Sequence, residues 1–118
     1  MESMMERLNG LARRKSRFTY DLRGACQVYT GIVSAYKATQ DSDQAMDLPA
    51  VIAHALDHDG IVGAWRDPSD GRIQYDSCRV FTDQESALRF ARAQGQRSVY
   101  NLNRDEEVPT DPDEMRAA

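Results

Sequence analysis

The strongest folding signal in this chain is a β-hairpin near its centre. Residues 61–66 and 72–81 are rich in β-branched and aromatic side chains, and Asp67-Pro68-Ser69-Asp70-Gly71 separates them. Proline fits the second position of a type I turn, and Gly71 can adopt the positive φ that the reversal needs. The sequence therefore predicts two antiparallel strands joined by this turn.

A helix is predicted on each side of the hairpin. Before it, Asp47 can cap a helix that Gly60 ends. The apolar positions of that helix have the spacing of a half-buried helix: Leu48, Val51, Ile52, Ala55 and Leu56. After the hairpin, Thr82 and Glu85 form a potential capping box for a second helix that ends at Gly95. The buried side of the second helix is predicted to comprise Ala87, Leu88, Phe90 and Ala91.

The outer segments are less regular. Residues 1–16 predict a short amphipathic helix, although Asn9-Gly10 interrupts it. Residues 25–38 and 97–103 have the composition of strands. The last segment, 105–118, is acidic and contains two prolines, so we expect it to be mostly unstructured. No internal repeat is evident in the sequence.

The order strand, helix, strand, strand, helix, strand predicts an α+β fold of the ferredoxin-like (split βαβ) type. Such a fold has a four-stranded antiparallel sheet with both helices on one face, and its first and third strands are central. We expect an N-terminal helix or arm at 1–16, one α+β domain at 17–104 and a flexible acidic tail at 105–118. The second sheet face also carries apolar residues, so the N-terminal helix or another chain, as in a homodimer, should cover it.

Composition narrows the class of protein. The 118 residues include 15 Lys and Arg against 19 Asp and Glu, and the resulting net charge of −4 is unlike that of a duplex DNA binder. No apolar run approaches the length of a membrane span, and the start of the chain lacks the apolar core of a signal peptide. We therefore expect a cytoplasmic protein without membrane association.

Residue types that bind metals or catalyse reactions form no familiar motif. Cys26 and Cys78 have no C-x-x-C spacing, so we expect buried, unreactive thiols rather than a zinc site or a disulfide. His54 and His58 could present two imidazoles to one metal, but no third ligand is evident and a solvated helix end explains them as well. Asp76 is unusual as a charged residue within a predicted strand. We expect no catalytic residue and no cofactor.

A protein-binding surface is predicted around the hairpin rim. Trp65, the single tryptophan, is explained either by core packing or as an interface anchor, because Trp and Arg dominate interface hot spots. The predicted surface joins the rim to the sheet face beyond it: Trp65, Arg66, Asp67, Tyr75 and Arg79. An RNA-binding sheet is an alternative because Tyr75 and Phe81 share one side of their strand, although Asp76 lies between them.

Several short motifs occur in an order that resembles a known group of sequences. They are Gly63-Ala64-Trp65-Arg66-Asp67-Pro68, Asp70-Gly71, Tyr75-Asp76-x-Cys78, Asp83-x-Glu85-x-Ala87, Gln96, Tyr100-x-Leu102 and Glu106-Glu107, with Thr30-Gly31-Ile32-Val33-Ser34 upstream. Together they resemble a small domain of hypothetical proteins from phages, plasmids and actinobacteria, over residues 17–108. The chain departs from that pattern at Ala64 and Asp70, where the pattern has Gly and Thr, at Cys78, which replaces its Ser region, and at Asn103-Arg104, where it has a Gly before its acids. The resemblance implies an accessory protein of a mobile element and carries over no catalytic residue.

These observations favour a non-enzymatic protein–protein interaction module of a mobile genetic element. Inhibition of a host defence or regulatory complex is one specific form of this hypothesis. The alternatives are a small metal- or ligand-dependent enzyme that uses His54 and His58, and an RNA-binding sheet module. Nucleic acid is the less favoured partner because the chain is acidic.

Overall fold

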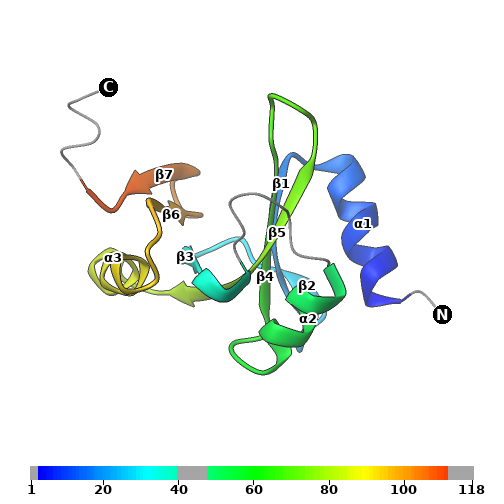
Figure 1. Cartoon of the computed structure of the whole chain (residues 1–118), viewed down its shortest axis with the longest axis horizontal. Helices are drawn as coiled ribbons and strands as arrows, with labels where there is room; N and C mark the ends of the chain where they lie inside the picture. The colour runs from blue at the N-terminus through cyan, green and yellow to red at the C-terminus, as the bar shows by residue number, and fades with distance from the viewer. Residues whose placement is uncertain (1–2, 40–47, 112–118) are drawn as a thin grey trace.

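An antiparallel sheet organises the fold, with α1 and α3 at opposite ends of the molecule (Figure 1). The computed structural model describes residues 3–39 and 48–111, and within these ranges it contains three α-helices, one 3₁₀ helix and seven strands. In chain order the elements are α1 (Met4–Arg14), β1 (Arg17–Asp21), β2 (Cys26–Gln27), β3 (Ile32–Ala35), η1 (Lys37–Thr39), α2 (Leu48–Leu56), β4 (Ile61–Arg66), β5 (Ile73–Phe81), α3 (Gln84–Ala93), β6 (Ser98–Asn101) and β7 (Glu106–Pro109).

The prediction of an α+β fold is confirmed, but the four-stranded ferredoxin-like sheet is wrong. The strand order is β2-β1-β4-β5-β3-β6-β7, and every neighbouring pair is antiparallel. Residues 25–38 form two separate strands, and β1 and β7 are additional ones. The predicted unstructured tail is likewise wrong in part, because β7 lies within residues 105–118 and pairs with β6.

The first helix runs through Asn9-Gly10 without the predicted interruption. A capping box at Ser3 and Glu6 fixes its start, since the Ser3 hydroxyl accepts from the Glu6 amide at 3.1 Å. Leu8 is completely buried, so packing of this side chain outweighs the cost of a helical glycine, about 1 kcal/mol.

The central hairpin and both flanking helices form as predicted, with one change at a cap. Asp83, not Thr82, caps α3, and its carboxylate accepts from the Ser86 amide at 2.9 Å. The helix therefore begins one residue later than the predicted capping box requires, and aspartate is as good a cap as threonine. The predicted cap of α2, Asp47, lies outside the described residues.

The two edge hairpins are built alike, a repeat that we did not predict from the sequence. Asp21 Oδ1 accepts hydrogen bonds from the backbone amides two and three residues later in the chain, at 3.0 and 3.1 Å. Asn101 Oδ1 accepts from the equivalent amides of its own loop at 3.0 and 3.2 Å. The loops end at Ala25 and Asp105, with φ of 51° and 53°. The sequence contains a sign of this repeat, because Tyr20-Asp21-Leu22 precedes one hairpin loop and Tyr100-Asn101-Leu102 precedes the other.

The core occupies one face of the sheet, which we call the helix face. Tyr20 pairs with Val62 and Val62 with Ser77, while Ile32 pairs with Phe81, four residues farther along β5 than Ser77. Side chains four residues apart in a strand point to the same side, so both halves of the core lie on that side. The cluster around α1 and α2 contains Leu8, Leu11, Ala12, Phe18, Tyr20, Val51, Ala55, Val62 and Ala64. The cluster under α3 contains Ile32, Ala87, Ala91 and Val99.

All three α-helices therefore pack on the helix face. Of the two alternatives for covering the second face, the N-terminal helix is excluded, because Leu8 and Leu11 of α1 belong to the same cluster as Val51 of α2. Among the described residues, no helix lies on the other side of the sheet, which we call the open face.

Candidate functional site

The open face carries the side chains that alternate with the core residues along each strand. Pairing places Arg17, Trp65 and Gln74 in one row across β1, β4 and β5. The next row contains Thr19, Gly63 and Asp76. Towards β3 and β6 the open face includes Cys78, Val80, Val33, Ala35, Ser98 and Tyr100.

The sheet curls so strongly that distant strands touch across the open face. β1 and β6 are four inter-strand steps apart, which would span about 19 Å in a flat sheet. The guanidinium carbon of Arg17 nevertheless lies 4.0 Å from the centre of the Tyr100 ring. This cation–π contact joins the two halves of the sheet across the hollow between them.

The curl creates a trough of about 840 Å³ that is open to solvent. Its lining combines aromatic, charged and small polar side chains, among them Arg17, Thr19, Trp65, Gln74, Asp76 and Tyr100. Trp65 and Tyr100 are partly buried, so their rings form walls of the trough and keep surface available for contact. A hollow of this size, with aromatic walls and charged groups beside them, can receive a ligand or a segment of a partner.

Asp76 lies in this trough, in the middle of the longest strand. Burial raises the pKa of its carboxyl from 3.8 to about 6. Across residues 3–39 and 48–111, no hydrogen bond or ion pair reaches the carboxylate. A partly buried carboxylate without a donor is destabilising, and such groups in clefts are candidates for ligand contact.

Asp76 should give the protein a measurable pH dependence. Because its folded pKa is above the ordinary value, the folded state binds the proton more tightly, and the contribution to stability falls as pH rises from about 4 to about 6. The unfolding free energy of Asp76→Asn minus that of wild type should therefore be about 2 kcal/mol larger at pH 7.5 than at pH 4. Urea unfolding of both proteins at the two pH values measures this, and a difference independent of pH would contradict it.

Cys78 is an unreactive thiol beside Asp76. It is buried, and burial followed by the negative charge of Asp76 raises the pKa of the thiol. A thiol held protonated is a poor nucleophile. Cys26, expected to be buried, is instead exposed at the edge strand, and both cysteines are free.

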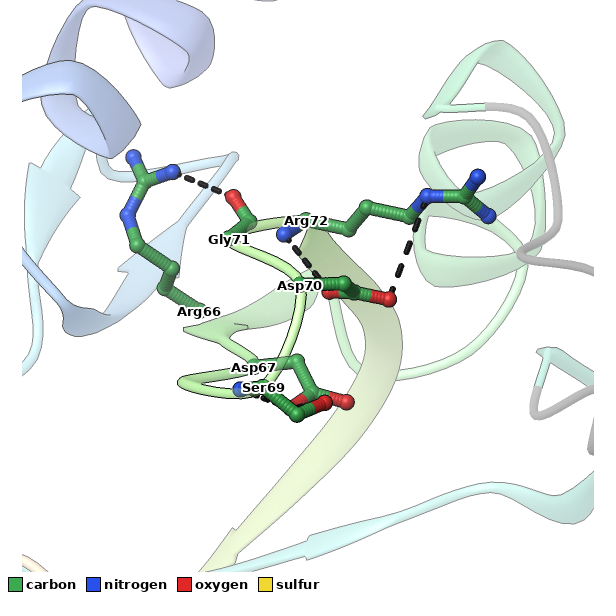
Figure 2. Close-up of polar contacts among 6 residues, drawn as sticks. All are labelled: Arg66, Asp67, Ser69, Asp70, Gly71 and Arg72. Carbon is green, nitrogen blue, oxygen red and sulfur yellow. Dashed lines mark hydrogen bonds and ion pairs between the residues drawn. The ribbon is translucent and has the colours of Figure 1, made fainter.

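Of the five residues predicted to bind a partner, two are used by the hairpin turn itself (Figure 2). Arg66 donates to the carbonyl of Gly71 at 2.6 Å and to that of Ala12 in α1 at 2.7 Å. The carboxylate of Asp67 accepts from the amide and hydroxyl of Ser69 at 2.9 and 2.7 Å, and this hydrogen bonding lowers the pKa of Asp67. Both side chains stabilise the turn and its contact with α1.

Tyr75 and Arg79 lie on the helix face and Trp65 on the open face, so the five residues do not form one surface. The Tyr75 hydroxyl donates to Asn9 of α1 at 2.9 Å, and burial raises its pKa. Arg79 lies 3.9 Å from the Asp59 carboxylate. Phe81 packs against the cluster under α3, so neither aromatic of β5 is free to stack on an RNA base.

His54 and His58 stack on each other, with ring centres 3.8 Å apart and planes within 8°. His54 Nδ1 lies 2.8 Å from the Ser77 hydroxyl, and His58 Nδ1 donates to the His54 carbonyl at 2.7 Å. Burial, and then the nearby His58, lowers the pKa of His54. Parallel rings do not aim two nitrogens at one point, and residues 3–39 and 48–111 contain no group of three or more potential ligands able to hold a metal.

The Ser77–His54 pair resembles a nucleophile with its base but is closed to substrate. Ser77 is completely buried, and its amide donates to Thr39 Oγ1 at 2.9 Å. Tyr36 packs on both histidine rings and bonds the Asp59 carboxylate. These contacts tie α2 and η1 to β5, between the two core clusters.

Comparison with protein-family models, curated proteins and solved structures finds no match for this chain. None of the helices in the described ranges has the length and apolar character needed to cross a bilayer.

Proposed function

We propose that this chain is a non-enzymatic binding module that docks a partner protein in the trough on the open face. The supporting observation is the trough itself, a hollow of about 840 Å³ formed across five strands, which no helix in residues 3–39 and 48–111 covers. Trp65, Tyr100 and Arg17 line it, and these residue types supply most interface hot spots.

A polypeptide segment suits this trough better than a small metabolite. Sites for small molecules usually bury most of the ligand surface, whereas this hollow is open and crosses β1, β4, β5, β3 and β6. A loop or strand of a partner can follow the hollow and place successive side chains against Trp65 and Tyr100. We extend the proposal to a cytoplasmic protein of a phage, plasmid or other mobile element, on the strength of the motif resemblance.

Variants of the open face should separate partner binding from folding. Trp65→Ala removes an aromatic wall, and Gln74→Arg fills the same row without removing that wall. Tyr29→Ala is the matched control, because Tyr29 is an exposed aromatic, 65% accessible, that does not line the trough. Each folded variant is used for affinity capture from nuclease-treated host lysate, and the captured proteins are identified by mass spectrometry. Wild type and the Tyr29→Ala control should capture one and the same partner protein, and both trough variants should lose it.

Hydrogen exchange on the isolated complex locates the interface independently. Protection in β4 and β5 on partner binding is expected. A partner that all variants retain, or protection confined to the helices, would contradict the proposal. Light scattering of the purified protein tests whether the partner is a second copy of this chain. A dimer that the trough variants no longer form would show that the trough is a homodimer interface.

A further inference from the structure

Gly63 and Asp76 are cross-strand neighbours in the trough, and we call the part of the trough that they line the Asp76 recess. Gly63 occupies the middle of the row between Thr19 and Asp76, so β4 contributes no side chain there. A Cβ atom at Gly63 would lie 2.9 Å from Cys78 Sγ, so the Cys78 sulfur lies over Gly63 and takes the space that such a Cβ would need. Asp76 lines the trough and is only partly buried, so a group that enters the trough can reach its carboxylate.

The walls of the recess suit an organic cation. Trp65 is the next open-face residue on β4 after Gly63 and is a diagonal neighbour of Asp76, within reach of a long side chain that contacts both. An indole face attracts ammonium and guanidinium groups and packs against the methylenes that carry them. Thr19 contributes a hydroxyl on the opposite side.

The charges around the recess leave Asp76 without a counterion. The charged residues that line the trough are Arg17, Lys37, Arg97, Glu107 and Asp76 itself, and Cys78 is the neighbouring thiol. Arg17 is the cross-strand neighbour of Trp65, and its guanidinium stacks on Tyr100. Among the described residues no cation forms an ion pair with Asp76, so an incoming cation would supply the missing partner.

We infer that the Asp76 recess is the specificity site of the trough and receives the ammonium or guanidinium group of a Lys or Arg side chain of the partner. This inference rests on the proposed docking function and names the chemistry that the docked segment must carry. Burial raises the pKa of Asp76 to about 6, so the carboxylate is charged at neutral pH and a bound cation would offset its lost hydration.

Small cations test the recess without knowledge of the partner. We would titrate ¹⁵N-labelled protein with n-butylammonium and n-propylguanidinium, with 1-butanol as the uncharged probe. Saturable shifts at Gly63, Asp76 and the Trp65 indole are expected in the millimolar range for the cations alone. Binding should weaken about tenfold in Asp76→Asn and remain unchanged in Glu106→Gln, an exposed carboxylate of β7.

The pH dependence adds a second readout. With a pKa of about 6, roughly one-tenth of Asp76 is ionised at pH 5 and nearly all at pH 7.5, so cation affinity should rise about tenfold between these values. In Asp76→Asn this rise should disappear. Equal affinity of wild type and Asp76→Asn, or shifts confined to residues outside the trough, would overturn the inference.

The inference and the proposed function can fail separately. If the partner is lost in Trp65→Ala and Gln74→Arg but retained in Asp76→Asn, docking stands and the cation site is wrong. If the cations bind through Asp76 but no protein depends on the trough, the cation site stands and protein docking is wrong.

Discussion

Replacing Leu8 by alanine is expected to lower the free energy of unfolding by about 3 kcal/mol. Leu8 is completely buried, and its neighbours in the core cluster come from α1, α2, β1 and β4. The substitution leaves a cavity where helices and sheet meet, and close-packed interiors collapse only partly around such a cavity. Urea unfolding followed by circular dichroism measures the change as a shift in midpoint.

Met5 is the matched control for Leu8. It lies in the same helix, is 38% exposed and is absent from the cluster, so Met5→Ala should change the unfolding free energy by less than about 0.5 kcal/mol. Similar small effects at both positions would mean that α1 is a detachable arm. A large loss for Leu8→Ala beside a small one for Met5→Ala would show that α1 is part of the core on the helix face.

Elements with complete local signals could be predicted from the sequence. The hairpin β4–β5 follows from its turn residues, and α2 and α3 follow from apolar spacing and glycine ends. The start of α1 is specified by Ser3 and Glu6, but its passage through Gly10 depends on burial of Leu8 against distant strands. Local propensity does not contain that packing energy.

The sheet order could not be predicted, because it depends on pairings between distant segments. β1 follows a run of basic residues, and Phe18, Thr19 and Tyr20 are buried in succession because the curled sheet covers both of their faces. β2 has only two residues, and β7 begins with two glutamates. Such strands lack the alternation that marks a strand in a sequence.

The candidate site could be predicted only in part. Trp65, an anchor candidate from its residue type, lines the trough, and the charge of Asp76 within a strand is a correct sign of an unusual environment. For Arg66 and Asp67 nothing in the sequence indicates that the turn itself uses their hydrogen-bonding groups. Arg17 and Tyr100 could not be found, since only the curl of the sheet joins residues so far apart in the chain.

Replacing Gly31 by alanine is expected to destabilise the protein by about 3 kcal/mol or more. Gly31 has φ of +105°, beyond the left-handed region that other residues occasionally occupy. An alanine Cβ there would lie 2.6 Å from Val80 Cγ1 and 3.1 Å from the carbonyl oxygen of Phe81. Its backbone also anchors the β6–β7 hairpin, because its carbonyl accepts from the Leu102 amide at 2.8 Å.

Two comparisons separate the causes of this loss. Gly71 has φ of +74° and no atom within 4 Å of the position that a Cβ would take, so Gly71→Ala should reveal the backbone cost alone, about 1 kcal/mol. Gly31→Ala made in a Val80→Ala background removes the closer of the two clashes and should cost less than in wild type. Thermal and urea unfolding give the coupling energy. If Gly31→Ala and Gly71→Ala lower the unfolding free energy equally, β3 and β5 must move apart readily to admit the new methyl group. That outcome would contradict a sheet whose curl is fixed before a partner binds.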